Sequence, residues 1–143
     1  MYITKEVYAK IIGGIVDATY ETGGILGEVA GIVCHVELDM GLGQPGMNKC
    51  YYSPDTQKLN KCISMWQKHN INFCGIFHSH LGNNETLSEG DLRYIRKIML
   101  AMPEQIKKLY FPLIVLPQNK MKLFAAVRYE QEIKIVEDSY KIV

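Results

Sequence analysis

The sequence lacks a long hydrophobic run, a strong charge imbalance and closely spaced pairs of cysteines. No apolar stretch among its 143 residues approaches the length of a membrane span, so we expect a soluble, cytoplasmic protein without a membrane partner. Lys and Arg number 16 and Asp and Glu 15, which gives a formal net charge of +1. This balance argues against a strongly cationic surface, and we expect no nucleic-acid partner.

The four cysteines, Cys34, Cys50, Cys62 and Cys74, are far apart and form no Cys-x-x-Cys pair. This spacing favours neither a zinc ribbon nor a disulfide framework, and reduced thiols in or near the core are the simplest interpretation. The sequence also contains no internal repeat, low-complexity tract or linker. Its length therefore predicts a single domain over residues 1–143.

The most informative stretch lies near the middle of the chain and reads F-H-S-H-L-G-N-N-E-T-L-S-E-G-D. The residues that lead into it, Ile71 to Phe77, are mostly apolar and predict a buried strand. Side chains alternate along a strand, so we expect His78 and His80 to share a face with Ile76 and Cys74. Both imidazoles would then project from the carboxyl end of the strand, where two nitrogens can reach one metal ion.

A helix is predicted after this strand, because Gly82 to Asn84 indicate a loop and Ser88 is a good N-cap. Asp91 would lie one turn into the helix and face back toward the strand end, as a third ligand. Catalytic zinc sites have three protein ligands and an open fourth position, so this set favours hydrolysis over a structural role. The apolar positions of the helix are Leu92, Ile95, Ile98, Met99 and Met102.

Each half of the pattern has a simpler interpretation. Ser88-x-x-Asp91 is also a capping box, in which the hydroxyl and the carboxylate bind free helix N–H groups. His78-x-His80 can be polar termination of a strand. The two halves at this separation are harder to explain without a metal.

Together, these residues resemble the JAMM (MPN) metalloproteases, whose signature is an upstream glutamate, His-x-His, seven residues and Ser-x-x-Asp. Here His78 and His80 are followed by Leu81 to Leu87, then Ser88 and Asp91. Many members have a proline after the second histidine, where this chain has leucine. The resemblance implies one catalytic Zn²⁺ bound by His78, His80 and Asp91.

The upstream glutamate is matched by Glu21, in the stretch E-T-G-G-I-L-G. Without the downstream motif, Glu21 is best interpreted as a solvated carboxylate after a helix. The resemblance makes it the general acid/base and makes Ser88 a hydrogen-bond donor to the oxyanion. It also implies that the segment Asp39 to Asn48 contacts substrate.

The resemblance implies hydrolysis of a peptide or isopeptide bond at the C-terminal tail of a ubiquitin-like or sulfur-carrier protein. The short segment between Asp91 and Tyr110 indicates a minimal core, so affinity could come from a partner or a homo-oligomer. Two alternatives remain open: a non-catalytic MPN-type interaction module and a RadC-like nucleic-acid-associated protein. The balanced charge weakens the second alternative.

The remaining chain predicts an α/β fold with a mixed sheet sandwiched by helices. The resemblance adds a cytidine-deaminase-like architecture. One helix is expected after Thr4, and Ser53-Pro54 predict the start of a second helix, with His69 at its end. His69 and His35 are not expected to bind metal.

The expected strands lie on either side of the motif. Two short strands or one bent strand are predicted over Ile25 to Val29 and Gly31 to Leu38. An antiparallel pair is predicted over Tyr110 to Leu116 and Met121 to Arg128. An edge strand is expected near Ile133 to Val136. The apolar stripes of the two helices are Val7, Ile11, Ile15 and Ala18 in the first, and Leu59, Cys62, Ile63 and Trp66 in the second.

Overall fold

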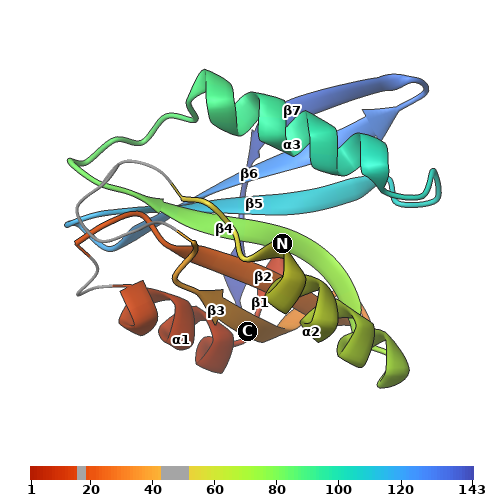
Figure 1. Cartoon of the computed structure of the whole chain (residues 1–143), viewed down its shortest axis with the longest axis horizontal. Helices are drawn as coiled ribbons and strands as arrows, with labels where there is room; N and C mark the ends of the chain where they lie inside the picture. Colours follow the sequence, from red (N-terminus) through yellow and green to blue (C-terminus); the bar gives the residue numbers. More distant parts are fainter. Residues whose placement is uncertain (16–18, 43–51) are drawn as a thin grey trace.

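A computed structural model describes residues 1–15, 19–42 and 52–143 of the chain. These residues form a mixed, curled sheet and three helices, as the sequence predicts (Figure 1). The helices are α1 (Lys5–Ile15), α2 (Thr56–Lys68) and α3 (Glu89–Ala101). The strands are β1 (Tyr2–Ile3), β2 (Gly23–Val29), β3 (Ile32–Asp39), β4 (Asn72–His80), β5 (Lys108–Val115), β6 (Lys120–Tyr129), β7 (Glu132–Asp138) and β8 (Lys141–Ile142).

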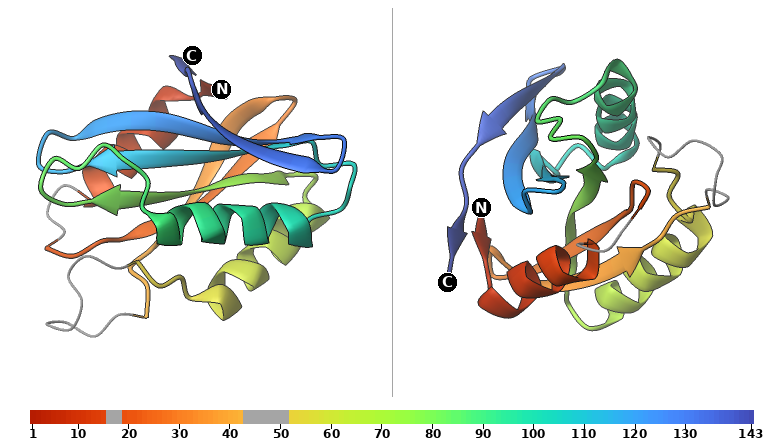
Figure 2. Two further views of the ribbon diagram at one scale, coloured as in Figure 1. Left: turned by 90° about the horizontal axis from the view of Figure 1, so that it is seen from above. Right: turned by 90° about the vertical axis from the view of Figure 1, so that its left-hand side faces the viewer.

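The strand order is β7-β6-β5-β4-β2-β3-β1-β8. β4 and β5 are parallel, as are β1 with β3 and β1 with β8, whereas the other pairs are antiparallel. The two edge strands, β7 and β8, are separated by only Ser139 and Tyr140 in the sequence. The sheet therefore curls until its edges approach each other, which Figure 2 shows from two sides.

The helices cover both faces of the sheet. α1 packs on one face through Val7, Ile11 and Ile15, all buried as predicted, whereas Ala18 lies outside the described residues. The Thr4 Oγ1 atom accepts a hydrogen bond from the Val7 N–H at 3.3 Å, as expected of an N-cap. α2 and α3 pack on the opposite face. Their shared core contains Ile25, Leu59, Trp66, Ile76, Ile95, Met99, Leu109, Phe111 and Ala126.

The predicted start of α2 at Ser53-Pro54 is wrong. The N-cap is Asp55, whose carboxylate accepts a hydrogen bond from the Lys58 N–H at 3.2 Å. The Asp55 N–H in turn donates to the buried carboxylate of Asp39 at 2.9 Å, which fixes where the helix begins. Aspartate is as good an N-cap as serine, so the local pattern could not choose between them.

The strand predictions hold in outline. β2 and β3 are two strands joined by Ala30 and Gly31, whose φ angles of 52° and 79° suit a tight hairpin turn. β5 and β6 form the predicted antiparallel pair, and β7 lies at an edge of the sheet.

No helix among the described residues is long and apolar enough to span a membrane.

One face assignment in β4 is wrong. Cys74 packs in the core beneath α1, whereas Ile76 packs on the opposite face with α2 and α3. The register between β2 and β4 shifts at Leu26 and Gly27, so β4 carries an irregularity at Cys74 that breaks the alternation. His78 and His80 follow this irregularity and keep the face of Ile76.

Candidate metal centre

The helix that follows β4 begins with a capping box. Ser88 Oγ accepts a hydrogen bond from the Asp91 N–H at 3.1 Å, and the Asp91 carboxylate accepts one from the Ser88 N–H at 2.7 Å. The capping interpretation of Ser88-x-x-Asp91 is therefore confirmed. It does not compete with metal binding, because the cap holds the carboxylate in place and leaves oxygen lone pairs facing the histidines.

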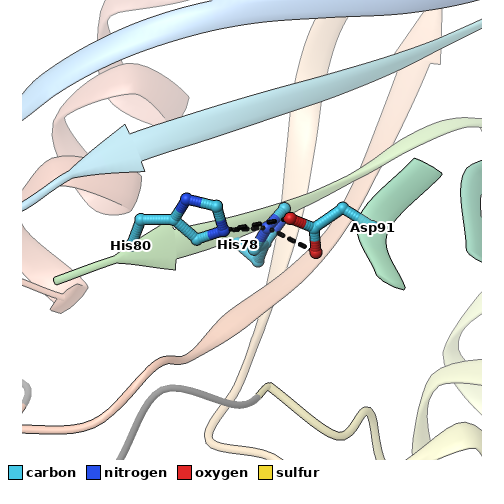
Figure 3. Close-up of side chains that lie close together, drawn as sticks. All are labelled: His78, His80 and Asp91. Atoms are coloured by element: carbon cyan, nitrogen blue, oxygen red, sulfur yellow. Dashed lines mark hydrogen bonds and ion pairs between the residues drawn. The ribbon is translucent and has the colours of Figure 1, made fainter. Parts of the chain in front are cut away.

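His78, His80 and Asp91 converge on one point, as Figure 3 shows. The two histidine Nε2 atoms are 3.1 Å apart, and they lie 3.2 Å and 3.1 Å from the two carboxylate oxygens of Asp91. The predicted ligand residues are thus brought together from β4 and from the first turn of α3.

The spacing of these donor atoms is close to the spacing of ligand atoms around a tetrahedral zinc ion. Ligand atoms placed about 2.0–2.2 Å from zinc at tetrahedral angles are separated by about 3.3–3.6 Å. The observed separations of 3.1–3.2 Å lie just below this range. Two imidazole nitrogens and one carboxylate oxygen are also a donor set that zinc accepts.

Electrostatics in the cluster favour an anionic Asp91 beside a cationic partner. Burial acts to raise the pKa of the Asp91 carboxyl, but hydrogen bonds from His78 and His80 hold it far below its usual range. Burial acts to lower the pKa of His80, but the carboxylates of Asp91 and Glu21 outweigh it and leave that pKa raised. The cluster therefore attracts positive charge, which a metal dication could supply in place of the proton.

Glu21 lies beside the cluster because β2 pairs with β4. Gly23 is the register partner of His78, and the Ser79 N–H donates to the Thr22 carbonyl at 2.8 Å. Glu21 precedes these residues and lines the same cavity as the two histidines. Burial raises the pKa of its carboxyl, although the charges of His80 and His78 oppose the shift. The catalytic roles of Glu21 and Ser88 stay predictions.

A cavity of about 370 Å³ opens over the cluster. Besides the residues already expected at the site, its lining includes several that the sequence did not indicate: Tyr52, Ser53, Pro54, Ile76, Asn84, Gly90, Tyr94, Ile95 and Phe111. Tyr94 and Ile95 follow Asp91 by one helical turn, so helical spacing could have found them. Tyr52 and Phe111 come from distant segments and carry no such signal.

Tyr52 is fixed by a buried carboxylate at the end of β3. Its hydroxyl donates to Asp39 at 2.7 Å, and its ring lies against Gly23 at the start of β2. Burial is the main reason why the pKa of this phenol is raised far above its usual value, with the hydrogen bond to Asp39 contributing. Asp39, expected at the start of a substrate-contacting segment, thus belongs to β3, and residues 43–48 of that segment lie outside the described residues.

The other two histidines are not part of the cluster. His69 is the C-cap of α2, and its Nδ1 lies 2.9 Å from the Met65 carbonyl. His35 lies edge-on to the Trp66 ring, with its Nδ1 3.2 Å from Cys34 Sγ. Cys34, Cys62 and Cys74 are free thiols as expected, and Cys50 lies outside the described residues. His69 therefore lies at the end of its helix, as the sequence predicts.

No protein-family model and no curated protein matches the sequence. Among solved structures, the fold is similar to protein DSY2949 from Desulfitobacterium hafniense, with a TM-score of 0.64 and 19% identity over 99% of this chain and 93% of that one. It is also similar to AF2198, a JAB1/MPN domain protein from Archaeoglobus fulgidus, with a TM-score of 0.57 and 16% identity over 100% and 97%. At these identities the likeness shows the fold alone, which is MPN-like.

Proposed function

We propose that this protein is a zinc-dependent metallopeptidase or isopeptidase of the JAMM type, with the cytidine-deaminase-like architecture of that family. The observation that carries the proposal is the convergence of His78, His80 and Asp91 at a cavity that Glu21 also lines. The MPN-like fold supports it, because AF2198, which shares this fold, is a JAB1/MPN domain protein.

Each residue has a role that its position supports. A zinc ion bound by His78, His80 and Asp91 would act as a Lewis acid and lower the pKa of a water ligand to near 7. Glu21 accepts the proton of the attacking water and returns it to the leaving amine nitrogen. Its raised pKa suits this exchange, because a carboxyl titrating closer to neutrality can both take and give a proton.

Ser88 is proposed as a donor to the oxyanion. Its oxygen already accepts the Asp91 N–H, whereas its own proton has no acceptor among the described residues. A hydroxyl can accept and donate at once, so the capping bond leaves this proton free. The helix N-terminus behind it adds positive potential at the same place.

The substrate in this proposal is an amide or isopeptide bond at the C-terminal tail of a ubiquitin-like or sulfur-carrier protein. This part rests on the motif resemblance. The minimal segment between Asp91 and Tyr110 supports a further element of the proposal, that a partner or a second copy of the chain assists substrate binding.

The first test is the zinc content per chain of the purified protein, measured by elemental analysis. We expect near one zinc in the parent and almost none in His78→Ala. The matched control is His69→Ala, which removes an exposed imidazole at the end of α2 and should retain the metal. A parent that neither contains nor takes up zinc would favour the non-catalytic interaction module.

Catalysis is tested by Glu21→Gln on a ubiquitin-like fusion with a cleavable tail. The variant should fold and hold zinc, because Glu21 is not a ligand, but turnover should fall by about 10²- to 10⁴-fold. Turnover equal to that of the parent would show that the proton-transfer role is wrong while leaving the metal site intact.

A further inference from the structure

The cavity over the metal ligands is also lined by apolar and aromatic side chains. We call four of these side chains the apolar subsite: Ile76, Tyr94, Ile95 and Phe111. Ile76, Ile95 and Phe111 are only 7%, 2% and 3% exposed, so they form its floor. The cavity volume of about 370 Å³ falls within the range of about 300–1,000 Å³ of ligand sites.

The subsite is built on the same two elements that carry the ligands. Ile76 precedes His78 by two residues on one face of β4, which is a distance of about 6.6 Å. Tyr94 and Ile95 follow Asp91 by one turn of α3, about 5.4 Å along its axis. The subsite residues are thus separated from the ligand residues by about 6.6 Å along β4 and about 5.4 Å along α3.

The chemistry of the wall selects an uncharged group. The charged or titratable side chains that line the cavity are Glu21 and the three ligand residues, of which His78, His80 and Asp91 lie together in one cluster. The hydroxyl of Tyr52, which also lines the cavity, is already bound to Asp39. A charged group placed against Ile76, Ile95 and Phe111 would lose its hydration without gaining a partner.

We propose that the apolar subsite binds an uncharged, apolar side chain of a residue that flanks the hydrolysed bond. The inference rests on the proposed function, because it assigns the subsite to the substrate of that reaction. It names a specificity determinant: substrates with a branched aliphatic or aromatic residue beside the bond are preferred over those with an acidic or basic one.

The main test uses hydroxamic acids that share one zinc-binding group. The zinc-loaded protein is titrated calorimetrically with acetohydroxamic acid, 4-methylpentanohydroxamic acid and succinic monohydroxamic acid. Burying the isobutyl end should strengthen binding about 10- to 100-fold over acetohydroxamic acid, and the carboxylate end should give no gain. Equal affinity of the apolar and the charged compound would overturn the inference.

A variant locates the preference. Tyr94→Ala removes one wall of the subsite and leaves the metal ligands in place. The ratio of the affinity for 4-methylpentanohydroxamic acid to that for acetohydroxamic acid should therefore fall to less than half of its value in the parent. Tyr110→Ala is the matched control, because Tyr110 is a similarly half-buried tyrosine that packs in the α1 core on the opposite face. Loss of the advantage in the control and not in Tyr94→Ala would overturn the placement.

A metal-free experiment separates this inference from the proposed function. Indole, added to the metal-free protein, should shift the backbone amide NMR signals of Ile76, Ile95 and Phe111. If zinc fails to bind but these shifts occur, the subsite stands and the proposed function fails. If zinc binds but indole causes no shifts there, the subsite is wrong and the metal site stands.

Discussion

The two faces of the sheet differ at the end of β4: one holds part of a closed apolar core, and the other holds a polar cluster beside a cavity. On the closed face, α1 lies over the sheet. The core residues of this face include Ile3 of β1 and Ile11 and Ile15 of α1, which are at most 1% exposed. On the open face, α2 packs against β2, β3 and β4, whereas α3 packs against β6 and β7. Figure 1 shows these two helices on separate parts of the sheet. The cavity over β4 and β5 is lined by residues of α3 and by residues 52–54, which precede α2.

This difference explains where a site can form. β4 serves both faces: Phe77 is fully buried in the closed core, and its neighbour His78 points into the cavity. On the open face, His78 and His80 lie next to each other and to Asp91, whereas an imidazole in the apolar closed core would lack such partners. The cavity on this face therefore gives the cluster room at the strand end.

The largest effect on stability is expected on the closed face. Ile11→Ala removes a fully buried side chain from the core-facing side of α1. It should lower the free energy of unfolding by about 2–5 kcal/mol, measured by urea denaturation. Zinc per folded chain should stay near one, because no ligand lies on that face. Ile12→Ala, at a partly buried neighbour, should cost less. Loss of zinc from folded Ile11→Ala would contradict the separation of the two faces.

Two helix caps give a comparison of intermediate size. Ser88→Ala and Thr4→Ala each remove an N-cap hydroxyl and should each lower the free energy of unfolding by about 0.5–2 kcal/mol in thermal or urea denaturation. Only Ser88→Ala, on the open face, should also lower turnover, by about 10²- to 10³-fold, if its hydroxyl serves the oxyanion. Equal turnover in the two variants would leave Ser88 with a capping role alone.

The smallest effect concerns two adjacent glycines in α1. A Cβ at Gly13 would meet nothing within 4 Å, whereas one at Gly14 would lie 2.6 Å from Leu38 Cδ1 of β3. Gly13→Ala should therefore raise the free energy of unfolding by about 0.5–1 kcal/mol. Gly14→Ala should gain less, because Leu38 must move. Equal gains in paired denaturation curves would show that α1 does not pack closely on β3 there.

Much of the fold was predictable because its signals are local. The apolar spacing Val7-Ile11-Ile15 predicts the buried stripe of α1, and the turn after Leu116 predicts the β5–β6 pair. Ser88 was identified as an N-cap from its own neighbourhood. The start of α2 was missed because Asp55 and Ser53 are equally good caps and a contact with Asp39 decided between them.

The face of Cys74 shows a different kind of failure. Alternation places it with Ile76, but the shift in register against β2 moves it to the closed core. Such an irregularity depends on the partner strand, which a local pattern does not contain. The short pairing of β1 with β8 is equally non-local, since it joins the two ends of the described chain.

The sequence by itself determined the candidate metal ligands, because His78, His80 and Asp91 lie at fixed separations on a strand end and a helix start. Only the tertiary structure decided the rest of the site. Glu21 lies beside the histidines because β2 pairs with β4, and the apolar subsite combines side chains of α3, β4 and β5 that tertiary packing brings together. Spacing along one chain fixes directions within an element, whereas distances between elements depend on packing that no single segment encodes.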